Sequence, residues 1–129
     1  SVGYSLTDYS EDADFDYSMK IVRLISKKVM KEGLRLGTCL NVNIPNVKED
    51  KIKGIKACRQ GKAFWDDTFD HRKDPLGKDY YWLTGSFGSK ELSSDTDINY
   101  LENNYVTIVP TQYDLTCHDS VEELKKWKL

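Results

Sequence analysis

Residues 63–84 read AFWDDTFDHRKDPLGKDYYWLT, a stretch in which two aromatic arms flank a short turn. The turn begins at Asp74, and Pro75 and Gly77 occupy its second and fourth positions. Pro presets its φ near about −65° and Asp can bond the backbone ahead of it, so these residues predict a type I turn. The stretch therefore predicts a long β-hairpin.

Large rings are expected on both faces of this hairpin, because successive side chains of a strand point to opposite faces. The rings that we expect to form an interface are those of Trp65, Phe69, Tyr80, Tyr81 and Trp82. A hairpin alone is marginally stable and cannot bury both of its faces. The core of the same chain could cover them. We favour cover by a partner subunit, because an apolar surface too large for a monomer marks an interface.

Length and charge narrow the classes of partner. The chain has 129 residues, which predicts one domain, and its net charge is −2 with 31% charged residues. This balance gives no reason to expect nucleic acid or an anionic membrane as partner. No apolar run approaches the length of about 20 residues that spans a membrane, and no signal peptide is visible. Cys39, Cys58 and Cys117 have no metal-ligand spacing, which indicates reduced thiols of a cytoplasmic protein.

Before the hairpin the sequence predicts strands at residues 2–6, 40–44 and 53–60. A helix is expected from residue 14 to residue 31, because apolar residues recur there at steps of three and four. These apolar residues are Phe15, Met19, Val22, Ile25 and Val29, with Ile21 and Leu24 widening the stripe. Acidic residues cluster at the start of this helix. They could form a metal site, but a charged helix start is the simpler interpretation.

Strand 40–44 alternates apolar and polar residues before Pro45. Asn41 and Asn43 therefore lie on the face opposite the apolar residues. They could contact a ligand, although hydrogen bonds to neighbouring loops are the commoner fate of such residues.

Residues 85–93 are rich in Gly and Ser and predict an exposed loop. A short helix is expected from Asp97 to Asn103, after the capping-type residues 94–97. Asn104 can then adopt the left-handed conformation that ends a helix.

The C-terminal part of the sequence predicts one strand and one helix. Residues 105–109 alternate, and the strand is expected to end at Pro110. Residues 116–119 resemble a capping box, with Asp in place of the usual Glu. The final helix is expected to run to about Trp127.

Few residues are candidates for chemistry within this chain. His71 and Asp67 share a strand face, but four residues separate them by about 13 Å, which is too far for a metal pair. Asp66 and Asp67 would serve as hard oxygen ligands, yet neighbours in a strand face opposite ways. Residues 95–97 are better placed as a site, on a loop that enters a helix, although helix capping is the interpretation that we favour for them. The common phosphate-loop, nucleophile-elbow and zinc-protease motifs are absent from the sequence.

An ordered series of segments carries a resemblance to a known family. The series consists of LNVNIP at 40–45, IKGI at 52–55, Trp65, DHRKDP at 70–75, YYWL at 80–83, DTD at 95–97, YVTIVP at 105–110 and DLT at 114–116. In order and spacing it resembles the C-terminal half of the SurE family, the stationary-phase survival proteins, which are metal-dependent 5′-nucleotidases. The resemblance covers nearly all of the chain.

The resemblance implies a fold. It implies an α/β protein, namely the C-terminal half of a Rossmann-like three-layer α/β fold with a long protruding β-hairpin. Residues 1–62 would be part of the α/β core and residues 63–84 the hairpin for oligomerisation. Residues 85–129 would hold elements that can be exchanged between subunits of a homodimer or homotetramer. The chain begins inside a predicted strand, so we expect an N-terminal segment to be missing from it.

The resemblance also implies an activity, the hydrolysis of nucleoside monophosphates with Mg²⁺ or Mn²⁺. The metal ligands of the family are an Asp-Asp pair, a Ser and an Asn of the N-terminal half, and none has a matching position here. We therefore assign no catalytic or metal-binding residue to this chain. Its expected role is to supply the oligomer interface and a wall of the active site, where Asp95, Thr96 and Asp97 would bind substrate. The alternative is a non-catalytic oligomerisation module.

Overall fold

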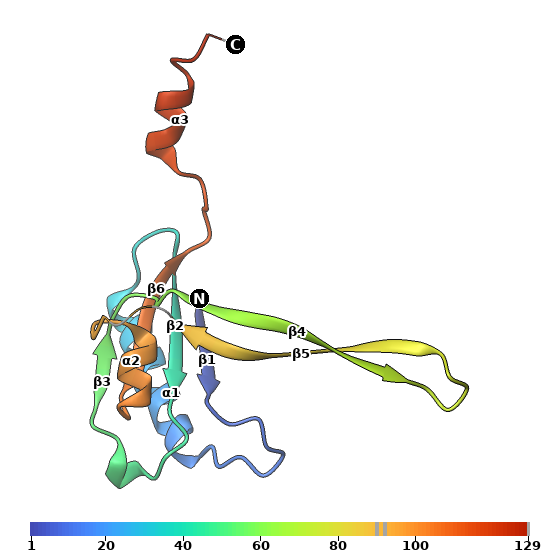
Figure 1. The fold of residues 1–129 in the computed structure, drawn as a ribbon. Helices are drawn as coiled ribbons and strands as arrows, with labels where there is room; N and C mark the ends of the chain where they lie inside the picture. The colour runs from blue at the N-terminus through green and yellow to red at the C-terminus, as the bar shows by residue number, and fades with distance from the viewer. Residues whose placement is uncertain (90, 92, 129) are drawn as a thin grey trace.

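The computed structural model describes residues 1–89, 91 and 93–128. The elements, in chain order, are β1 (Val2–Leu6), α1 (Asp16–Glu32), β2 (Thr38–Ile44), the short 3-10 helix η1 (Glu49–Lys51), β3 (Ile55–Ala57), β4 (Ala63–Lys73), β5 (Asp79–Ser89), α2 (Asp97–Glu102), β6 (Val106–Gln112) and α3 (His118–Leu124). Figure 1 shows a small α/β body, a long hairpin that projects from it, and α3 lying beyond the end of β6.

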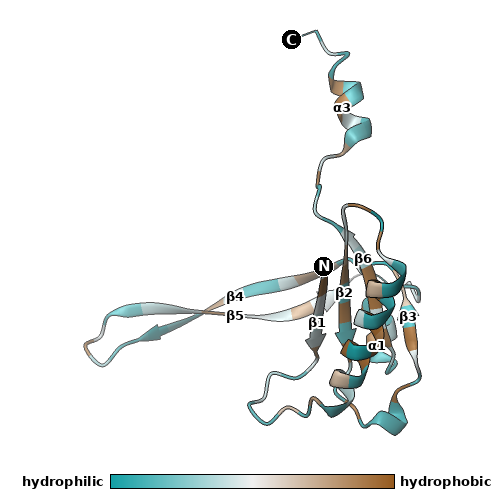
Figure 2. Cartoon of the chain, turned by 180° about the vertical axis from the view of Figure 1, so that it is seen from behind, coloured by the Kyte–Doolittle hydropathy of each residue, from teal (hydrophilic) through white to brown (hydrophobic). Residues whose placement is uncertain are grey.

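The body is built on a four-stranded mixed sheet with the order β1-β2-β6-β3. The pairs β1–β2 and β3–β6 are parallel, and β2–β6 is antiparallel. Helix α1 covers one face of this sheet and α2 the other, as the two opposite views of Figures 1 and 2 show. The expected three-layer α/β architecture is confirmed.

The core lies between α1 and the sheet. Val42 and Ile44 of β2 and Val106 of β6 are almost fully buried, and they pack against Ile21 and Ile25 of α1. The predicted alternation of strand 40–44 is thus confirmed, with its apolar residues facing α1. The buried stripe of α1 is narrower than predicted, because three of its expected members are about half exposed. These are Phe15, Met19 and Leu24.

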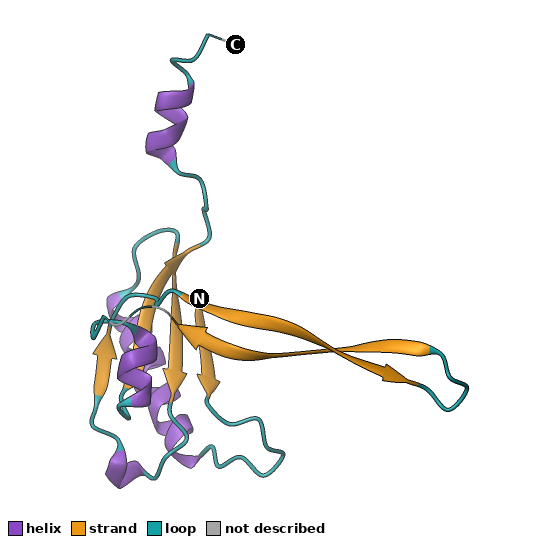
Figure 3. Ribbon diagram, in the orientation of Figure 1, coloured by secondary structure: helices purple, strands orange, loops and turns teal. Residues whose placement is uncertain are grey.

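The predicted hairpin is confirmed and is longer than the sequence indicated. Strands β4 and β5 have 11 residues each and pair from Ala63–Ser89 to Lys73–Asp79. Figure 3 shows both strands extending together away from the body. The turn between them is confirmed by the hydrogen bond from Gly77 N–H to Asp74 O, at 2.9 Å. Asp74 Oδ1 accepts two further N–H groups, and Gly77 has a φ of 79°.

The loop predicted over residues 85–93 is wrong for residues 85–89, which belong to β5. The glycines that suggested a loop have a cross-strand role instead. A Cβ on Gly85 would lie 2.3 Å from Trp65 Nε1, and a Cβ on Gly88 would lie 2.9 Å from Phe64 Cζ. Glycine is therefore needed where these rings lie across β5. The predicted loop also includes Lys90 and Leu92, which lie outside the described residues.

Strand β6 does not end at Pro110 as predicted but continues to Gln112. Pro110 lies opposite Leu40, whose N–H donates to Ser1 O on the β1 side. The ring nitrogen of Pro110 therefore points away from β2, to the side where β3 has already ended at Ala57. The chain after β3 stays beside β6 as far as the hydrogen bond from Cys58 N–H to Ile108 O, at 3.0 Å, and Pro110 has no N–H with which to continue this pairing.

Other boundaries are partly as predicted. The strand expected at 53–60 is reduced to β3. Helix α2 is confirmed, with Thr96 as N-cap and Asn104 at a φ of 64°. The predicted capping box is wrong, because the N-cap of α3 is Cys117, which makes no side-chain cap bond, and α3 ends at Leu124. None of the described helices is long and apolar enough to cross a membrane.

Candidate functional site

The carboxyl ends of the parallel strands β1 and β2 lie at one edge of the sheet, where open α/β sheets bind their ligands. Two hollows flank this edge, and Leu6 lines both. We call them the α1-side hollow and the α2-side hollow, after the helix that lines each. The two hollows lie on opposite faces of the sheet, and different side chains therefore line them.

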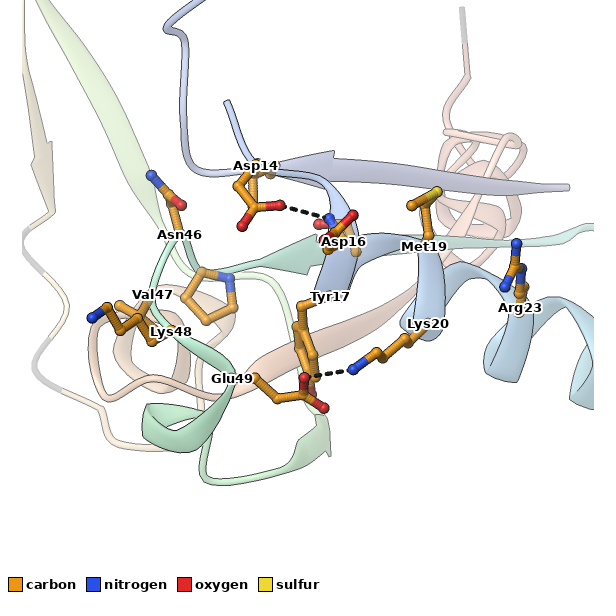
Figure 4. Close-up of a pocket in the computed structure, with 13 residues that line it drawn as sticks. Asp14, Asp16, Tyr17, Met19, Lys20, Arg23, Asn46, Val47, Lys48 and Glu49 are labelled. Carbon is orange, nitrogen blue, oxygen red and sulfur yellow. Dashed lines mark hydrogen bonds and ion pairs between the residues drawn. The ribbon is translucent and has the colours of Figure 1, made fainter. Parts of the chain in front are cut away.

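The α1-side hollow has a volume of about 830 Å³ and is shown in Figure 4. Its charged lining residues balance, since three are acidic and three are basic. They are Asp14, Asp16, Glu49, Lys20, Arg23 and Lys48. Glu49 and Lys20 form an ion pair at 2.6 Å across one end of the hollow, and Asp14 accepts the N–H of Asp16 at 2.9 Å. Asp14 thus acts at the helix start, as the simpler interpretation of the acidic cluster requires.

The α2-side hollow is smaller, about 270 Å³, and its lining differs in character. Ser5 and Asn43 lie side by side on the sheet face that α1 does not cover, and the Ser5 hydroxyl donates to Asn43 Oδ1. The remaining residues that line this hollow are Leu6, Thr7, Tyr9, Asp97, Ile98 and Leu101. Asn43 thus bonds the neighbouring strand β1 and not a loop as predicted, and the same residue lines a hollow.

The structure separates the three residues expected to bind substrate. Thr96 is 3% exposed and accepts the N–H of Asn99 at 3.3 Å, so it acts as a helix cap. Asp97 lines the α2-side hollow, and its Oδ1 accepts the N–H groups of Gly61 and Ile98 at 2.7 and 2.9 Å. Asp95 is not among the lining residues of this hollow. Asp97 is therefore the member of the three that the geometry places at the candidate site.

Asp95 takes part in an ion cluster where the hairpin leaves the body, which we call the hairpin root. Arg59 binds both oxygens of Asp95 and also donates to Glu91 Oε1 at 2.6 Å, while Glu91 Oε2 accepts the N–H of Lys62 at 2.8 Å. The Arg59 guanidinium lowers the pKa of Asp95 to about 2, and it also lowers the pKa of Glu91. Sequence reasoning missed this cluster, because more than 30 residues separate Arg59 from both carboxylates.

The hairpin carries its rings on both faces. The register places Phe69 opposite Leu83, and Trp65 opposite Phe87. The five rings predicted to form an interface are all substantially exposed, from 40% for Tyr80 to 67% for Phe69. Phe87, which is 59% exposed, was not predicted as an interface ring, because its segment was expected to form a loop.

The two histidines do not form a shared site. His71 Nε2 lies 2.7 Å from Asp79 Oδ1 on the hairpin, and its ring stacks on Tyr81. His118 Nε2 lies 2.9 Å from Asp114 Oδ2 at the start of α3. Among the residues that the structure describes, no group of three or more His, Cys, Asp or Glu side chains could hold a metal ion.

Comparison with known proteins gives the family. A family model described as "Survival protein SurE" matches residues 1–67. A 5′-nucleotidase SurE from Christiangramia forsetii is 50% identical over 129 residues, which are 100% of this chain and 50% of that protein. Another from Flavobacterium psychrophilum is 46% identical, with the same coverage of both chains.

A solved structure agrees with these sequences. The crystal structure of the SurE protein from Aquifex aeolicus matches with a TM-score of 0.77 and 35% identity, over 96% of this chain and 50% of that one. The chain spans about half the length of the curated relatives it matches. On the family match and the identity over its whole length, the chain belongs to the SurE family.

Proposed function

We propose that this chain is one part of a 5′-nucleotidase that hydrolyses nucleoside monophosphates to nucleoside and phosphate. The observation that supports this most is its 50% identity, over its full length, to half of a protein named 5′-nucleotidase SurE. The hollows at the carboxyl ends of β1 and β2 agree with such a role, since ligands of α/β sheets bind at that edge. In this proposal the chain supplies one wall of the active site.

The metal would be held outside this chain. The resemblance to the family implies Mg²⁺ or Mn²⁺, which prefer clustered oxygen ligands. The described residues do not fit such an ion, because they contain no group of three or more His, Cys, Asp or Glu side chains that could hold it. We therefore assign the metal ligands to the complementary half of a longer protein and assign none to this chain.

The second proposed contribution is the oligomer interface of a homodimer or homotetramer. The aromatic residues of β4 and β5 are exposed on both faces, which favours cover by a partner subunit. Helix α3 supports the proposal that C-terminal elements are exchanged, because its apolar side and a tryptophan three residues beyond its end are also exposed. The residues concerned are Val121, Leu124 and Trp127. We propose a cytoplasmic location as well, and the three free cysteines agree with it.

A non-catalytic assembly module is the second candidate function. The lack of a metal-binding group among the described residues favours it for the chain acting by itself. The exposed hairpin and the exposed α3 would then be its functional parts.

Phosphate release tests the nucleotidase proposal. The longer protein that contains this chain is incubated with adenosine 5′-monophosphate and Mn²⁺, and then with the chelator EDTA. We expect phosphate release that EDTA abolishes and added Mn²⁺ restores. The absence of release from a panel of nucleoside monophosphates, with either Mn²⁺ or Mg²⁺, would contradict the proposal.

A further inference from the structure

The charge of the α2-side hollow indicates which end of a nucleotide it can accept. Among the described residues that line it, Asp97 is the one Asp or Glu, and there is no Lys or Arg. A carboxylate without a neighbouring cation repels a phosphate group. The hollow is therefore suited to the uncharged sugar and base. The α1-side hollow, with three basic and three acidic side chains, has no such bias.

Asp97 is held in place as a hydrogen-bond acceptor. Its Oδ1 accepts two backbone N–H groups, which fixes the carboxylate where β4 and α2 begin. Its Oδ2 accepts no hydrogen bond from any residue in the described part of the chain. A fixed carboxylate with a free oxygen is the group that acidic residues of nucleotide-binding folds offer to ribose hydroxyls.

Asn43 and Ser5 add uncharged polar groups beside Asp97. Both lie on a sheet face close to the carboxyl edge, whereas the opposite face of the same strands is apolar and packed against α1. The Asn43 side chain has one carbonyl and one NH₂ group, and within the described part of the chain only the carbonyl is engaged, by Ser5. The amide can therefore donate to a ligand in the hollow.

Tyr9 and α2 supply apolar contact. Tyr9 lies on the rim of the hollow and is fully exposed, so its ring offers a face for stacking. Stacking of a base on an aromatic ring tolerates any base, because every base has a π-face. Ile98 and Leu101 of α2 line the same hollow.

We propose that the α2-side hollow binds the nucleoside of the substrate, with Asp97 accepting from the ribose hydroxyls, Asn43 donating to the sugar or base, and Tyr9 stacking on the base. This inference rests on the proposed nucleotidase function and deepens it, because it names the part of the substrate that this chain recognises. Asp97 and Tyr9 are then the residues that distinguish nucleotides from other phosphate esters.

Titration of the ¹⁵N-labelled chain tests binding directly. Adenosine is expected to shift the amide resonances of residues 5–9, Asn43 and Asp97, and 2′,3′-dideoxyadenosine is expected to bind at least about tenfold more weakly. Asp97→Asn keeps an oxygen for Gly61 and should weaken adenosine binding by a similar factor. Asp67→Asn, on the exposed surface of β4 and outside the hollow, is the matched control and should bind as the unmodified chain does.

A second pair of variants removes exposed rings, so neither is expected to disturb the core. Tyr9→Ala removes a fully exposed ring and is expected to weaken adenosine binding by about tenfold. Tyr113→Ala removes another exposed ring, outside the hollow, and should leave binding unchanged. Equal binding of adenosine and its dideoxy analogue, or shifts confined to residues outside the hollow, would overturn the inference.

Kinetics of the longer protein separate this inference from the proposed function. For Asp97→Asn we expect the ratio of kcat/KM for adenosine 5′-monophosphate to kcat/KM for 4-nitrophenyl phosphate to fall by about tenfold. Failure to hydrolyse either ester would contradict the proposed function, and the titration would still decide the inference. Hydrolysis of both esters with an unchanged ratio would contradict the inference alone.

Discussion

Arg59 binds Asp95 through two hydrogen bonds, from Nε to Oδ2 at 3.0 Å and from Nη2 to Oδ1 at 2.9 Å. This pair joins the segment before β4 to the segment before α2. The backbone follows the same path, since Arg59 O accepts the N–H of Asp97 at 3.0 Å. Glu91 brings the segment after β5 into the cluster through the same guanidinium. The hairpin root is thereby tied to α2 and, through Asp97, to the α2-side hollow.

Acid should loosen the hairpin root. Because Arg59 lowers the pKa of Asp95 and of Glu91 in the folded chain, their contribution to stability is present above the pKa values of the unfolded carboxyls, about 4. It is lost as the pH falls from about 4 toward 2, the pKa of folded Asp95. We expect Asp95→Asn to lower the Tm at pH 7 and to reduce the loss of Tm between pH 5 and pH 2.5, measured by circular dichroism.

Asp67→Asn is the control for this experiment. Asp67 lies on the exposed surface of β4, outside the ion cluster of the hairpin root. The Asp67→Asn substitution should leave the Tm and the dependence of the Tm on pH nearly unchanged. An Asp95→Asn chain that loses as much Tm in acid as the unmodified chain would show that the cluster does not stabilise the root.

Removing rings from one hairpin face should reduce the oligomer. Phe69 and Tyr81 lie on the same face and are 67% and 65% exposed. In the longer protein, Phe69→Ser combined with Tyr81→Ser should shift the sedimentation coefficient from that of an oligomer to that of a monomer, because interface rings carry much of the binding energy. Thr68→Ser, on the other face of β4, is the control. An unchanged oligomer in the double variant would argue against the interface proposal.

Gly85 should tolerate no side chain. A Cβ there would lie 2.3 Å from Trp65 Nε1 and 2.5 Å from Asp66 O, so either the ring or the backbone of β4 must move. We expect Gly85→Ala to destabilise the chain by about 1–3 kcal/mol and to shift the indole N–H resonance of Trp65. Gly3→Ala is the matched control, since its Cβ would lie at an ordinary 3.9 Å from Leu40 O. A chain that accepts Ala at position 85 without change would contradict the observed register.

Removing a few side-chain atoms from the core under α1 should lower the stability of the chain strongly. Ile44 is 1% exposed and packs in the cluster of Ile21 and Val106. We expect Ile44→Ala to lower the free energy of unfolding by about 2–5 kcal/mol, measured by urea denaturation. Ile55→Ala, at a residue that is 36% exposed, should cost clearly less. Similar losses for the two variants would show that Ile44 is not at the centre of the core.

The elements that the sequence predicted well depend on local interactions. Helix α1 follows from its apolar spacing, and the hairpin turn follows from Asp74, Pro75 and Gly77, whose hydrogen bonds close within a few residues. Strand β2 follows from alternation and from the Pro that ends it. In each case the chain within a few residues determines the structure.

What the sequence failed to predict depends on contacts between distant segments. In the sequence alone, Gly85 and Gly88 are typical of a loop. Their role as strand residues depends on the rings of Trp65 and Phe64, which lie across them from β4. Pro110 is typical of a strand end, but β6 continues beyond it to Gln112, beside a β3 that ends at Ala57. The same limit applies to the candidate site, where Asp97 was predicted but Ser5 and Tyr9, from the first strand and its loop, were not.

Our central claim is that this chain supplies recognition and assembly, while the metal and the reacting groups lie in the other half of a longer protein. The most direct measurement compares the isolated chain with the longer protein, at equal molar concentration, for phosphate release from adenosine 5′-monophosphate with Mn²⁺. We predict release by the longer protein and none above the buffer rate by the isolated chain. Metal-dependent release by the isolated chain would contradict the claim.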